Sequence, residues 1–100
     1  MNKKRISEGF IYIISNPSFP NFYKVGVTID IQSRLKTYQT ADPKRSYHIE
    51  HYIFHSNCYE MEKKINELFR PFALSIRNEW YEINKSMAIS ILDDQVEKLK

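Results

Sequence analysis

The stretch from Gly9 to Gly26, GFIYIISNPSFPNFYKVG, determines the fold that we expect for this chain. Residues 10–14 and 22–27 are two short runs of β-branched and aromatic residues, which favour strands. Between them, residues 15–21 hold two prolines and two asparagines, residue types that end strands and form turns. The stretch therefore predicts an antiparallel hairpin with a long connecting loop.

The rest of the chain alternates between helical and strand patterns. The expected elements are a helix that Asp30 caps and Asp42 ends, a strand over 46–55, a helix that Ser56 or Asn57 caps and Pro71 stops, an extended segment over 80–83, and an amphipathic helix over 85–99 that Asn84 caps. The order β-β-α-β-α-(β)-α predicts an α+β fold, with a small three-stranded antiparallel sheet flanked by helices. Trp80 is expected to fill the core.

The composition indicates a single folded domain over residues 1–100, with its motifs in residues 9–83. A hydrophobic content of 42% and an aromatic content of 14% exclude a disordered chain. No run approaches the ~18 apolar residues of a membrane span, and no signal peptide is expected. The single Cys58 excludes an internal disulfide. We therefore expect a cytoplasmic protein, or a nuclear or viral-factory one in a eukaryotic host.

The net charge is +3 and the isoelectric point is about 9.0, which permits nucleic-acid contact without requiring it. The positive charge is concentrated in the first half of the chain. The basic residues there are Lys3, Lys4, Arg5, Lys24, Arg34, Lys36, Lys44 and Arg45. This distribution weakly favours one basic face, and Lys36, Lys44 and Arg45 are candidate contacts for DNA.

Several residues recur in the order and spacing of a known family. They are Phe10-Ile11-Tyr12, with Gly9 one place earlier than the family has it, Lys24-Val25-Gly26, Arg34 eight residues after Gly26, Tyr38 four residues further, Glu62 in the helix after the third strand, and Glu79-Trp80-Tyr81. In this order the sequence resembles the GIY-YIG nuclease superfamily and, within it, the phage T5 Orf172-type branch. Any one match is weak, so the resemblance rests on the ordered set.

The resemblance implies a DNA endonuclease that hydrolyses phosphodiester bonds with one divalent metal, Mg²⁺ or Mn²⁺. Glu62 would hold the metal, and Tyr12, assisted by Lys24, would activate water. Arg34 would stabilise charge on the phosphoryl group, and Tyr38 would hydrogen-bond a phosphate oxygen or water. These five residues are the candidate catalytic group.

The residues themselves leave alternatives open. Arg34 and Tyr38 share the helix face that points to the sheet, and an arginine there is a surface residue or a phosphate clamp. Tyr12 is a core tyrosine or a base, and a base would need a cation such as Lys24 to lower its pKa from near ~10. Glu62 is a half-exposed boundary residue or a ligand facing a cleft.

Lys24 occupies, without a gap, the position where the superfamily's second motif has a tyrosine. Tyr23 points to the opposite strand face and would fill that role only after an insertion that reverses side-chain facing. We keep Tyr23 as a candidate DNA contact. A lysine cannot act as a phenol does, so the alternative function is a DNA-binding module with weak or no catalysis.

A protein-interaction domain is a third alternative. No appended recognition motif is visible in the sequence, so specificity would come from a homodimer, a partner protein or the structure of the DNA.

Overall fold

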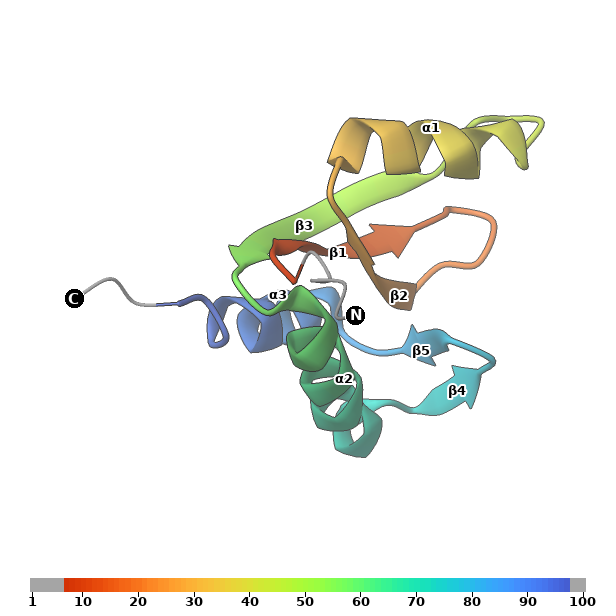
Figure 1. Cartoon of the computed structure of the whole chain (residues 1–100). Coiled ribbons are helices and arrows are strands. Elements are labelled where there is room, and N and C mark those ends of the chain that lie inside the picture. Colours follow the sequence, from red (N-terminus) through yellow and green to blue (C-terminus); the bar gives the residue numbers. More distant parts are fainter. Residues whose placement is uncertain (1–6, 98–100) are drawn as a thin grey trace.

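Five strands and three α-helices make up the part of the chain that the computed structural model describes, residues 7–97 (Figure 1). The elements are β1 (Gly9–Ser15), β2 (Phe22–Thr28), α1 (Ile31–Thr40), β3 (His48–His55), α2 (Cys58–Phe69), the short 3-10 helix η1 (Arg70–Phe72), β4 (Ser75–Arg77), β5 (Trp80–Glu82) and α3 (Lys85–Asp93). None of the helices in this range is long and apolar enough to cross a membrane.

The strands form one antiparallel sheet in the order β3-β1-β2-β5-β4. The predicted hairpin is β1–β2, in which Tyr12 lies opposite Gly26. On its other side β1 pairs with β3. β5 pairs only with the first three residues of β2, where Lys24 lies opposite Trp80. The α+β class is confirmed.

The prediction of a three-stranded sheet is wrong, since the sheet has five strands. β4 and β5 have three residues each, shorter than the ~4–8 residues over which strand alternation can be recognised. The connection between them is Asn78-Glu79, with Asn78 at φ 58°, a left-handed conformation that asparagine tolerates better than most residues. The segment expected to stand alone at 80–83 is therefore half of a second hairpin.

Helices α2 and α3 cover one face of the sheet, and α1 lies on the other side (Figure 1). Side chains alternate along each strand, so every second one enters the core between the sheet and α2 and α3. The main core contains Ile11, Ile13, Tyr23, Val25, Ile53, Ile65, Phe69, Tyr81, Ala88 and Leu92. The other sheet face, which carries Tyr12 and Lys24, is left for α1 and for contacts outside the domain.

Two predicted helix starts are confirmed. The side chains of Asp30 and Asn84 each accept a hydrogen bond from the backbone N–H three residues further on, at 3.0 and 3.1 Å, which satisfies a donor that the helix itself leaves free. The last helix ends at Asp93, earlier than predicted. Lys3, Lys4, Arg5 and Leu99, on which some expectations rested, lie outside the described residues.

Candidate functional site

The centre of the candidate site is the Tyr12 phenol, which lies across the neighbouring strand β2. A Cβ atom at Gly26 would overlap the phenol ring and its hydroxyl. Glycine is therefore the residue that lets Tyr12 lie there. Tyr12 is 2% exposed, and its hydroxyl forms a hydrogen bond of 3.2 Å with the Tyr38 hydroxyl.

Tyr38 connects α1 to the sheet, although α1 has no buried residue. The Tyr38 ring meets the Tyr12 ring edge to face, with centroids 6.3 Å apart, and lies 5.1 Å from the Tyr47 ring. The Gln39 amide makes hydrogen bonds of 2.9 and 3.0 Å with the backbone C=O and N–H of Tyr47. These contacts hold the helix side that also carries Arg34, one turn earlier.

Burial raises the pKa of Tyr12 well above its ordinary value of 10.0, and the hydrogen bond with Tyr38 raises it further. The cation that acts against this rise is Arg34, whereas we had predicted Lys24. The rise prevails, so the phenol is neutral at physiological pH. The raised pKa opposes the role of base that we expected of Tyr12 and favours its use as a hydrogen-bonding group.

Lys24 is the β2 side chain that faces the site. Its Nζ atom lies 3.7 Å from a carboxylate oxygen of Glu79 and 5.7 Å from the centroid of the Tyr38 ring, close enough for a cation–π contact. Tyr23 points the other way, as alternation predicts, and is 8% exposed within the main core. Tyr23 is thus not available for the DNA contact that we expected of it.

Glu62 comes from α2, on the opposite side of the sheet, yet its charge acts on Tyr12. β5 pairs with β2 only as far as Lys24, so within residues 7–97 no further strand flanks the rest of β2 on that side. We attribute the electrostatic effect of Glu62 on Tyr12 to this open edge of the sheet. Burial raises the pKa of the half-buried Glu62, Glu79 raises it further, and Lys24 lowers it.

The donor set around Glu62 fits Mg²⁺ better than zinc. Residues 7–97 contain no group of three or more His, Cys, Asp or Glu that could hold a metal, and zinc sites usually need three or four such ligands. A single carboxylate completed by waters and phosphate oxygens suits Mg²⁺. Within the described chain no group donates a hydrogen bond to the Glu62 carboxylate, so a cation would relieve the cost of its burial.

The other basic candidates do not join this group. Lys36 is two residues from Arg34, which places it ~200° around α1. Lys44 and Arg45 are exposed in the loop between α1 and β3. The Asp42 carboxylate accepts hydrogen bonds from the backbone N–H groups of Lys44 and Ser46 and holds this loop. Contact of Lys36, Lys44 and Arg45 with DNA stays a prediction.

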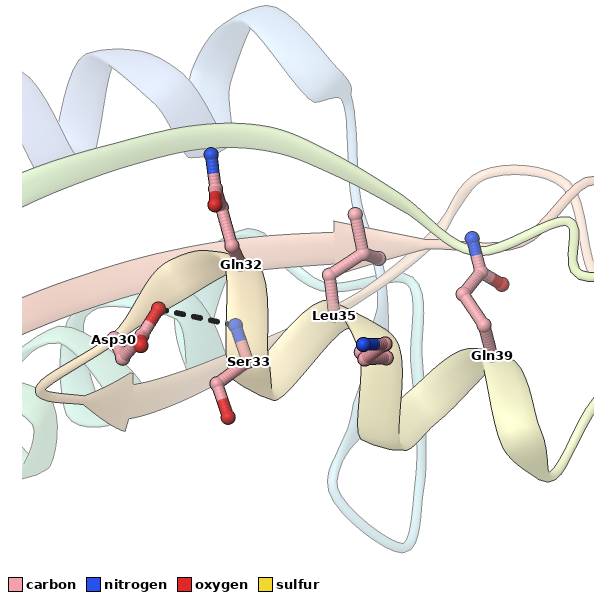
Figure 2. Close-up of a pocket in the computed structure, with 6 residues that line it drawn as sticks. Asp30, Gln32, Ser33, Leu35 and Gln39 are labelled. Carbon is pink, nitrogen blue, oxygen red and sulfur yellow. Dashed lines mark hydrogen bonds between the residues drawn. The ribbon is translucent and has the colours of Figure 1, made fainter.

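A hollow of about 500 Å³ follows α1 and contains none of the candidate catalytic residues. It is lined by Asp30, Gln32, Ser33, Leu35, Lys36 and Gln39. Figure 2 shows Gln32, Leu35 and Gln39 projecting from one side of the helix. Every lining residue comes from α1 or its N-cap, so no second element supplies a convergent group, and we assign the hollow no function.

An aromatic row beside the site was missed from the sequence. Trp80 was expected in the core, but it is half-buried on the site face because it lies opposite Lys24. Its ring centroid lies 4.8 Å from that of Phe19 and 6.4 Å from that of Tyr47. Alternation could have found it, since Tyr81 enters the core and its neighbour must face the other way.

A sheet face that gathers tyrosine hydroxyls, a lysine and a nearby arginine is the kind of surface that contacts a phosphodiester backbone. The chain belongs to the T5orf172 domain family, whose model matches residues 9–97. No curated protein and no solved structure matches the chain. The family confirms the branch that the motifs indicated, and the wider GIY-YIG assignment stays a prediction.

Proposed function

We propose that this chain is a GIY-YIG-type endonuclease domain that hydrolyses phosphodiester bonds of DNA with one Mg²⁺ or Mn²⁺ ion. The observation that carries the proposal is the meeting of Tyr12, Tyr38 and Lys24 at one point of the sheet face. Arg34 and Glu62 both lie within electrostatic reach of that point. Membership in the T5orf172 family supports a nuclease or DNA-binding module.

Two cations would bind the phosphate. The exposed Arg34 guanidinium presents paired donors that match two phosphate oxygens. Lys24 supplies a charge that Glu79 and the Tyr38 ring already hold in place. Fixed charges aimed at a developing negative charge are typically worth ~3–4 kcal/mol of barrier each.

The tyrosine pair would position water. With a raised pKa, Tyr12 keeps its proton and orients the attacking water by a hydrogen bond, while Tyr38 fixes the direction of the Tyr12 hydroxyl. Glu62 is the residue that would hold the metal. A divalent ion bound there would supply positive charge to the scissile phosphate and leaving oxygen.

Nicking of supercoiled plasmid in Mg²⁺ or Mn²⁺ tests the proposal. Wild type should nick, and Arg34→Gln and Glu62→Gln should each lose on the order of 100-fold or more in rate. Glu60→Gln is the matched control, because it removes an exposed carboxylate from the same helix, and it should cut like wild type. If wild type cuts no better than Glu62→Gln, the nuclease proposal fails.

The second candidate is a module that binds DNA without cutting it. The observation that favours it is Lys24 itself, which is paired with Glu79 where the superfamily has a tyrosine. Such a module would bind DNA with an affinity that falls as salt rises, and Lys24→Gln and Arg34→Gln would weaken that binding. Binding of this kind without any nicking would establish the second candidate.

A further inference from the structure

A second hollow opens on the sheet face that carries Lys24, beside the strand partner of Lys24, Trp80. It measures about 240 Å³ and is lined by Phe19, Phe22, Arg77, Asn78 and Trp80. The Phe19 and Trp80 rings meet edge to face at 79°. Three aromatic walls thus stand beside one cationic and one amide side chain.

Strand register places this pocket beside the candidate phosphate site. Trp80 lies opposite Lys24 on β2 and opposite Arg77 on β4, so the three side chains share one sheet face. The Tyr47 ring lies between Trp80 and Tyr38, at centroid distances of 6.4 and 5.1 Å. A row of rings therefore connects the pocket with the tyrosine pair.

The pocket matches the chemistry of an unpaired nucleobase. A base face stacks on aromatic rings whatever its sequence identity. The Asn78 amide offers both a donor and an acceptor to a base edge, and its backbone is fixed by the left-handed turn between β4 and β5. Arg77 is exposed and suits the adjoining phosphate. A base inside a duplex has both faces covered by its neighbours and cannot enter such a pocket.

We propose that the pocket formed by Phe19, Phe22, Trp80, Arg77 and Asn78 binds an unpaired nucleobase whose neighbouring phosphate lies at Lys24. The substrate class is then DNA with single-stranded or unpaired positions, and continuous duplex is disfavoured. This inference rests on the proposed DNA function and names the substrate of the same site.

Trp80 is the only tryptophan of the chain, so fluorescence excited at the red edge of the absorption band, where tyrosine absorbs little, reports on this residue of the pocket. The full-length Glu62→Gln variant, which should not cut, is titrated in EDTA with a twelve-nucleotide thymidine strand and with a closed hairpin duplex. We expect the strand to quench the Trp80 emission and to bind at least tenfold more tightly than the duplex. Adding one bulged thymidine to the hairpin should restore quenching.

Variants in the same background separate the pocket from the phosphate site. Phe19→Ala and Arg77→Gln should each weaken the thymidine strand about tenfold and leave duplex binding unchanged. Arg70→Gln, which removes an exposed arginine outside the pocket, is the matched control and should bind like its parent. A thermal melt of each variant checks that it is folded, and Arg77 is exposed, so its replacement should not disturb the fold.

Each outcome decides the inference. Equal binding of strand and duplex with unchanged Trp80 emission would overturn the base pocket, while the DNA function would stand. If neither DNA binds at low salt, the proposed function fails as well. If Arg70→Gln weakened strand binding as much as Arg77→Gln does, the loss would follow from the net charge of the protein and not from the pocket. That result would also overturn the inference.

Discussion

Gly26 carries no side chain, and the Tyr12 phenol occupies the space that a side chain would need. Glycine weakens a strand by adding backbone freedom to the unfolded chain, so its presence in β2 has a local cause. That cause is the hydroxyl contact between Tyr12 and Tyr38, which the crossing ring makes geometrically attainable. At the residue scale the site thus depends on the lack of a side chain at Gly26, which leaves room for the Tyr12 ring.

Gly26→Ala should displace the Tyr12 ring and destabilise the fold by about 1–3 kcal/mol, the usual cost of overpacking. Nicking should fall with it. Urea unfolding measures the stability. In the double variant Gly26→Ala/Tyr12→Leu the smaller side chain makes room, so its loss should be less than the sum of the two single losses. Strict additivity would show that the two residues do not compete for space.

Glu62→Gln should raise the melting temperature at neutral pH. The folded-state pKa of Glu62 is raised by burial, so its ionisation favours the unfolded chain. That cost is present above the folded pKa and disappears as pH falls below the ordinary value of 4.5. Calorimetry at several pH values, with the exposed Glu60→Gln as control, measures it. A wild type more stable than Glu62→Gln at neutral pH would contradict the assignment.

Helix α1 carries the exposed Arg34, and none of the residues of this helix is buried. It is held by the Tyr38 ring and by the two hydrogen bonds between Gln39 and the Tyr47 backbone. By contrast, α2 buries Cys58, Ile65 and Phe69. At the element scale, α2 packs into the core, whereas α1, which carries the proposed phosphate contact Arg34, is held by few contacts.

Amide hydrogens of α1 should therefore exchange faster than those of α2, because few buried contacts oppose local opening. Hydrogen exchange followed by mass spectrometry measures this. Gln39→Ala should speed exchange in α1 further and leave β1 unchanged, and DNA should slow it. Equal protection of α1 and α2 in the free protein would contradict the light attachment.

The elements that could be predicted are those with local signals. β1 and β2 are runs of apolar residues around a proline-rich turn, and Asp30 and Asn84 are caps that act within one helical turn. The β4–β5 hairpin lacks such a signal: its strands are short, and β5 is fixed by pairing with β2, which is distant in sequence. Trp80 is a different case, because alternation with the buried Tyr81 indicates that its side chain faces away from the core.

The position of Glu62 is a property of the whole molecule. The motif spacing named this residue, but its environment depends on where α2 crosses the sheet, on the short β5, and on Glu79 and Lys24. Its raised pKa could not be predicted from sequence, because burial is decided by tertiary packing. A second carboxylate also depends on residues distant in sequence, because Glu97 accepts a hydrogen bond of 2.9 Å from the backbone N–H of Ser56.

Two carboxylates that accept hydrogen bonds, those of Asp42 and Glu97, should make the fold sensitive to acid. Hydrogen bonds from Ser46 and Lys44 lower the pKa of Asp42, and those from Ser56 lower the pKa of Glu97. A depressed carboxyl pKa adds stability above the unfolded value, and this stability is lost as pH falls through the folded value. Urea unfolding from neutral to acidic pH should show this loss.

Asp42→Asn should lose less stability than wild type over the same pH interval, because it lacks one of the two titrating contacts. An identical pH dependence in the two proteins would contradict the role of Asp42.

The central claim is that the sheet face around Tyr12 is the DNA site. An NMR titration of ¹⁵N-labelled Glu62→Gln with DNA that contains unpaired thymidines tests it most directly, since every non-proline backbone amide reports its own position. We predict the largest shift changes at Tyr12, Lys24, Gly26, Arg34 and Tyr38, and small changes along α3 on the opposite side. Changes concentrated on the outer surfaces of α2 and α3, with Lys24 and Gly26 unmoved, would contradict the claim.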